Sequence, residues 1–132
     1  MKPAVQRYVE NVVEVRSLTG MNTDLSVADF EGTELKADQP LAVVFTASWC
    51  PFCSMFTPIF KSTLSKNKLP YGSVDLTSYD NPLWETFEIE VVPTVVIFKN
   101  GKATYRADGM YGRGLPKSVV DDVVRELSAA GN

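Results

Sequence analysis

The sequence predicts one α/β domain, built as a three-layer α/β/α sandwich around a mixed β-sheet. Two observations support this fold class. In the first half of the chain, the short apolar runs 41–47 and 71–76 alternate with helical patterns. In the second half, the apolar run 95–98 leads into a hairpin signal and then a closing helix. The 132 residues contain no repeat or linker, so they fit a single domain with a sizeable core.

The first 19 residues predict a helical extension that precedes a main domain at 20–132. Within 3–16, apolar residues recur at helical intervals and charged residues fall between them. We favour packing of this helix on the domain's own sheet. The alternative is that it docks a partner or forms an oligomer.

The segment before the central strand contains one short strand and one short helix in our prediction. Residues 21–25 form the strand. Ser26 followed by Asp29 resembles a helix N-cap with an acidic first turn, which predicts a helix over 27–36. Asp38-Gln39-Pro40 then breaks the chain before the apolar, β-branched run 41–47, which is typical of a buried strand.

The rest of the chain predicts three more helices, two strands and a hairpin. A long helix follows Cys50 and ends within 66–70, with a kink at the interior Pro58. Strand 71–76 is followed by a helix that begins at Asn81-Pro82 and ends near 88. Strand 95–98 enters a turn at 99–102 and returns along 103–106. The last helix covers about 116–129.

Cys50 and Cys53 are the only cysteines, and they flank Pro51 and Phe52. In a helix that begins at Cys50, positions i and i+3 share one face with Cβ atoms roughly 5–6 Å apart, so the pair can form a disulfide with little backbone movement. The partial positive charge of a helix N-terminus favours a thiolate, the nucleophile of disulfide exchange. We therefore expect Cys50 to be the attacking sulfur and Cys53, one turn further, to be the shielded resolving sulfur.

Other roles for the two cysteines, and other classes of function, are less favoured. A structural zinc site needs four Cys or His ligands, and the chain has no histidine, which also excludes Ser–His and Cys–His catalysis. A purely structural disulfide across so short a loop would stabilise little. We see no metal, flavin or nucleotide site and expect no cofactor.

A net charge of −3 disfavours nucleic acid and anionic membranes as partners. The absence of a signal pattern or apolar span predicts a cytoplasmic chain.

Several motifs together resemble the thioredoxin family over roughly residues 20–130. They are Trp-Cys-x-x-Cys at 49–53, Pro58 five residues past Cys53, Val-Pro-Thr at 92–94 and Phe-Lys-Asn-Gly at 98–101. The resemblance implies a thioredoxin-like fold with a protein-disulfide reductase activity. It also implies a cis Val92–Pro93 bond beside the cysteines. The implied apolar docking surface for substrates comprises Trp49, Pro51, Phe52, Val92, Pro93, Gly109 and Met110.

The sequence departs from the family pattern at two places. Val44 stands where thioredoxins carry a buried aspartate, and Ser73 aligns with the lysine that neighbours it. Asp75 or a bound water is then our candidate proton acceptor for Cys53, and we expect slow resolution near neutral pH. Pro51-Phe52 replaces the usual Gly-Pro and resembles the glutaredoxin Pro-Tyr, which predicts a somewhat weaker reductant.

These observations favour a thioredoxin-type reductase that acts on disulfide-containing proteins and is restored by a separate reductase or small thiol. Three alternatives stay open. A glutaredoxin-like, glutathione-dependent reductase is one, although Trp49 and the 98–101 motif argue against it. An exported disulfide oxidase or reductase would need a leader. A non-catalytic thioredoxin-fold binding module would keep the disulfide without using it.

Overall fold

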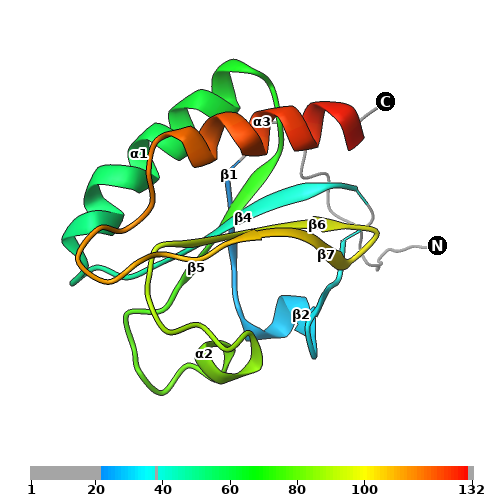
Figure 1. Ribbon diagram of the computed structural model, residues 1–132. Coiled ribbons are helices and arrows are strands. Elements are labelled where there is room, and N and C mark those ends of the chain that lie inside the picture. Colours follow the sequence, from blue (N-terminus) through cyan, green and yellow to red (C-terminus); the bar gives the residue numbers. More distant parts are fainter. Residues whose placement is uncertain (1–21, 38, 131–132) are drawn as a thin grey trace.

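A five-stranded mixed sheet forms the centre of the computed structural model, which describes residues 22–37 and 39–130 (Figure 1). Its strand order is β1-β5-β4-β6-β7. The strands are β1 (Asn22–Leu25), β4 (Leu41–Thr46), β5 (Tyr71–Asp75), β6 (Thr94–Lys99) and β7 (Lys102–Ala107). β5 pairs in parallel with both β1 and β4, whereas β6 is antiparallel to β4 and to β7. The predicted α/β fold with a mixed sheet is confirmed.

Helices cover both faces of this sheet. Figure 1 shows α1 (Pro51–Lys66) and α3 (Ser118–Ala130) together on one face and the single-turn α2 (Leu83–Thr86) on the other. Side chains of β4 alternate between two apolar clusters. Leu41, Val43 and Phe45 pack on the side of α2, and Ala42 and Val44 pack beneath α1 and α3. Because both faces are covered, β4 is a continuous apolar run and not an alternating one.

The helix predicted over 27–36 is wrong. The Ser26–Asp29 cap is present, since the Ser26 amide donates to the Asp29 carboxylate at 2.8 Å, but it starts only one 3₁₀ turn, η2 (Val27–Asp29). A small hairpin follows, formed by β2 (Phe30–Glu31) and β3 (Glu34–Leu35). Gly32, with φ of 61°, turns this hairpin, and Phe30 and Leu35 become buried against the sheet. Burial of two apolar side chains in an extended segment therefore outweighs the helix-start signal.

The other predicted elements are present with shifted ends. The helix predicted from Asn81 to 88 is reduced to α2, and Glu88 has φ of 50°, outside helical geometry. α1 continues through Pro58 as one helix, and a kink there stays a prediction. Asn100 and Gly101 both have positive φ in the β6–β7 turn, as a two-residue hairpin loop requires.

The extension proposed for residues 1–19 lies outside the described residues. Within the described part of the chain, no helix combines the length and apolar character that crossing a membrane requires.

Candidate functional site

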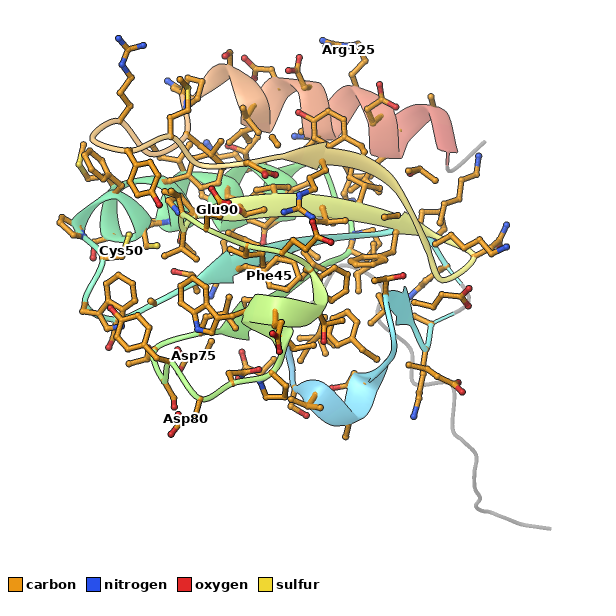
Figure 2. All side chains as sticks on the ribbon, turned by 60° about the horizontal axis from the view of Figure 1, so that its bottom comes forward. Phe45, Cys50, Asp75, Asp80, Glu90 and Arg125 are labelled. Atoms are coloured by element: carbon orange, nitrogen blue, oxygen red, sulfur yellow. The ribbon has the colours of Figure 1, made fainter. Side chains whose placement is uncertain are left out.

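The two cysteines lie where β4 ends and α1 begins. Cys50 has extended backbone and occupies the N-cap of α1, with Pro51 as the first helical residue. The Cys53 amide donates to the Cys50 sulfur at 3.1 Å, so the sulfur satisfies one of the free N–H groups of the first turn. Both thiols are free. The local geometry is thus the strand-to-helix corner that the sequence predicts, and Figure 2 shows Cys50 at one end of the molecule.

A second segment reaches Cys50 from the start of β6. The Val92–Pro93 peptide bond is cis, and the Cys50 thiol donates to the Val92 carbonyl at 3.4 Å. The loop after β7 packs against the same place. A Cβ added at Gly109 would lie only 2.5 Å from the Pro93 carbonyl oxygen, so this approach requires glycine. Three segments far apart in sequence therefore meet beside Cys50.

The sulfurs of the two cysteines open on different hollows. Each cysteine is buried, with 4% of Cys50 and 2% of Cys53 exposed, so exposure alone barely distinguishes them. Cys50 lines a hollow of about 500 Å³ that we call the aromatic groove. Cys53 lines a separate hollow of about 520 Å³ that we call the polar groove. The two hollows share no lining residue, so the two cysteines border different hollows.

The aromatic groove contains most, but not all, of the predicted docking surface. Five predicted residues line it: Trp49, Pro51, Phe52, Val92 and Met110. Pro93 and Gly109 do not line it: Pro93 is buried, and Gly109 packs on the Pro93 carbonyl. The lining that sequence reasoning missed comprises Tyr79, Trp84, Glu90, Val91, Tyr111 and Gly112.

Three stacked aromatic rings form one wall of this groove. Ring centroids of Trp49 and Tyr79 are 5.3 Å apart, and those of Trp49 and Trp84 are 6.3 Å apart with nearly parallel planes. The indole N–H of Trp49 donates to the Thr77 carbonyl at 2.9 Å, and that of Trp84 donates to the Ser78 carbonyl at 3.1 Å. The aromatic wall could have been predicted from the pairing of β4 with β5. β4 and β5 are parallel, so the residues after each strand meet at the same edge of the sheet.

The polar groove opens on Cys53 through hydroxyl and charged side chains. Its lining is Thr46, Ala47, Ser48, Cys53, Ser54, Thr57, Pro58, Lys61 and Asp75. Burial raises the pKa of Cys53 from 9.0 to about 11, and its hydrogen bond with Cys50 acts in the same direction. Hydrogen bonds with the Thr46 side chain and the Ala47 backbone lower the pKa in part. The Thr57 hydroxyl donates to that of Thr46 at 3.5 Å.

No carboxylate lies at the position where the family pattern has a buried aspartate. Val44 is fully buried in the cluster beneath α1 and α3, and its partner on β5 is Ser73. Ser73 donates to the Asp24 carboxylate at 3.3 Å. Two residues further along both strands, Thr46 pairs with Asp75. Asp75 is the only carboxylate that lines the polar groove among the described residues, which keeps it as the candidate proton acceptor.

Comparison with known proteins identifies the family. The sequence profile of the family described as thioredoxin matches residues 21–121. The chain belongs to the thioredoxin family. A thioredoxin from Rickettsia bellii is 37% identical over 87 residues, which cover 62% of this chain and 79% of that protein. A bifunctional thioredoxin reductase/thioredoxin from Mycobacterium leprae is 28% identical over 112 residues, which cover 83% of this chain.

The similarity extends to solved structures of thioredoxins. Spinach chloroplast thioredoxin f superposes with a TM-score of 0.65 at 19% identity, covering 87% of this chain and 90% of that one. At this identity the likeness concerns the fold alone. The matched region amounts to 24% of the length of the Mycobacterium leprae protein, so the thioredoxin domain is one part of that larger relative.

Proposed function

We propose that this chain is a thioredoxin-type protein-disulfide reductase that works through Cys50 and Cys53. The observation that carries the proposal is the placement of the two free thiols. They occupy the N-cap and first turn of α1, one facing an aromatic groove and the other a polar groove. Membership of the thioredoxin family supports the same activity.

The reaction takes two exchange steps. The Cys50 thiolate attacks one sulfur of a substrate disulfide; a Cys50–substrate bond forms, the substrate bond breaks, and the leaving thiolate takes a proton. Cys53 then loses its proton, and its sulfur attacks the Cys50 sulfur. The Cys50–Cys53 disulfide forms, and the second substrate thiolate leaves and is protonated. The substrate gains two electrons and two protons, and the protein becomes oxidised.

The geometry supports these roles for the two cysteines. Cys50 lies at the groove where a substrate strand can approach the Val92 backbone, and strand addition of this kind tolerates many partner sequences. The raised pKa disfavours Cys53 as the first nucleophile. It also requires help with deprotonation in the second step. We assign this help to the Thr46 hydroxyl and to Asp75, through water in the polar groove.

The electron donor in this proposal is a separate reductase or a small thiol. A relative named as a bifunctional thioredoxin reductase/thioredoxin supports a dedicated reductase as donor. Reduction by glutathione, the glutaredoxin-like alternative, has only the Pro51-Phe52 dipeptide in its favour. The cytoplasmic location stays a prediction.

Insulin reduction in the presence of dithiothreitol tests the activity. We expect the wild-type protein to reduce insulin and Cys50→Ser to be inactive. Cys53→Ser should accumulate a covalent complex with the substrate, because the resolving sulfur is absent. An inactive wild-type protein would favour the non-catalytic binding module, and trapping by Cys50→Ser instead of Cys53→Ser would reverse the assignment of the attacking sulfur.

A further inference from the structure

The aromatic groove contains one charged side chain. Among its lining residues Glu90 is the only aspartate, glutamate, lysine or arginine, and it is exposed. Across residues 22–37 and 39–130, no hydrogen bond or ion pair joins its carboxylate to another residue. The groove beside the Cys50 sulfur therefore presents an unneutralised negative charge.

The chain around Glu90 strengthens this charge. Residues 69–98 contain no lysine or arginine. Their five carboxylates are Asp75, Asp80, Glu85, Glu88 and Glu90. Figure 2 shows Asp75, Asp80 and Glu90 on the same side of the molecule as Cys50. Such a one-signed surface attracts cationic partners and repels anionic ones.

Three basic residues outside this segment are paired or line other hollows. Arg106 reaches the Phe87 carbonyl at 2.6 Å and is paired with Asp108 at 2.5 Å, so its charge is neutralised. Lys61 lines the polar groove, and Arg113 lines a third hollow beside Met55. None of the three lines the aromatic groove.

The aromatic wall favours a cation as well. The indole N–H groups of Trp49 and Trp84 are engaged by backbone carbonyls, so both rings are held in a fixed orientation. Trp49 is 45% exposed and Tyr79 is 74% exposed. The face of an aromatic ring carries negative electrostatic potential and attracts lysine and arginine side chains. Planar guanidinium groups also stack on such faces.

We propose that the aromatic groove binds an arginine or lysine side chain close to the target cysteine of the substrate. The aromatic rings would contact the face of the cation and Glu90 would pair with its charge. A purely apolar occupant fits less well, because it would cover the Glu90 carboxylate without pairing it. The inference rests on the proposed reductase function and adds a substrate class: disulfides flanked by basic residues.

Two cyclic disulfide peptides that differ at one position test this inference. One carries arginine directly before the first cysteine, and the other carries citrulline, which has nearly the same shape without the charge. We expect kcat/KM to be about three- to tenfold higher for the arginine peptide at low salt, as an exposed cation–π contact plus an ion pair would give. The ratio should fall as salt is added.

Two glutamate variants separate direct contact from the general field. Glu90→Gln removes the ion pair and leaves the aromatic contact, so it should lower the arginine-to-citrulline ratio to the share of the cation–π contact, about two- to fivefold. Glu85→Gln removes an equal charge from α2 at a residue that does not line the groove, and it should keep most of the preference. An equal fall in both variants, or equal rates for the two peptides with wild-type protein, would overturn the proposed contact.

Insulin reduction run in parallel distinguishes the two levels of the proposal. If insulin is reduced while the two peptides react equally, the basic-residue preference is wrong and the reductase function stands. If neither insulin nor the peptides are reduced, both proposals are wrong.

Discussion

The raised pKa of Cys53 makes the stability of the reduced protein depend on alkaline pH. The thiol is 2% exposed, and its pKa rises from 9.0 to about 11, chiefly because burial disfavours the thiolate. In the unfolded chain the same thiol titrates near its ordinary value. Below about pH 9 it is protonated in both states, and the full stability is present. As the pH rises from about 9 to 11, the unfolded state ionises first, and the folded state loses stability.

The size of this loss of folding stability follows from the difference between the folded and unfolded pKa of Cys53. A two-unit difference corresponds to about 3 kcal/mol once the pH is above both values, and about half of that is lost by about pH 10. Typical domains are stable by about 5–15 kcal/mol, so the effect is large enough to measure. The oxidised protein has no thiol at this position and should lack the effect.

Urea unfolding of the reduced protein between about pH 8 and 11 checks this prediction, with Cys53→Ser as the matched control. Groups that titrate in this range without contacting Cys53 cancel in the comparison. Tyr105, whose pKa is raised by burial and by Asp122, is one of them. The wild-type protein should lose about 1.4 kcal/mol more than the variant by about pH 10. Parallel losses in the two proteins would refute the burial argument.

Three further predictions concern single residues. Thr46→Val removes a hydrogen bond that lowers the pKa of Cys53; rapid-quench kinetics near neutral pH should show a longer-lived mixed disulfide, and an unchanged lifetime would contradict the assigned role. Gly109→Ala places a Cβ 2.5 Å from the Pro93 carbonyl oxygen, so urea unfolding should show a loss of about 1–3 kcal/mol; unaltered stability would mean that the loop yields freely. Phe45→Ala empties a fully buried site beside Phe30 and Phe87, and calorimetry should show a loss of about 3–5 kcal/mol; a cost under 1 kcal/mol would mean that the core collapses around the gap.

The fold was predictable where the spacing of apolar residues agreed with the positions of the residues that end helices and strands or form turns. β4 is recognisable because both its faces are buried, and the β6–β7 hairpin because Asn100-Gly101 favours positive φ. The segment 27–36 failed because a local cap signal was read without knowledge of where Phe30 would pack. Its ring lies 5.3 Å from that of Phe87, which is 57 positions away by sequence number (87 − 30). Contacts between residues so far apart in the sequence cannot be predicted from the local pattern of residue types.

The candidate site divides in the same way. Cys50, Cys53 and the apolar rim follow from one motif and its spacing. Glu90, Tyr79 and Trp84 were missed because nothing local distinguishes them from ordinary loop residues. Tyr79 and Trp84 reach the groove because β4 and β5 run parallel and end at the same edge, and Glu90 reaches it because β6, antiparallel to β4, begins there.

The separation of the two grooves has a consequence for the size of the protein's clients. A client that stays within the aromatic groove leaves the polar groove, which shares no lining residue with it, open to bulk water. The proton of Cys53 can leave on that side throughout the attachment. A short peptide that fits the aromatic groove should therefore be released faster, once it is joined to the protein, than a client wide enough to cover both grooves.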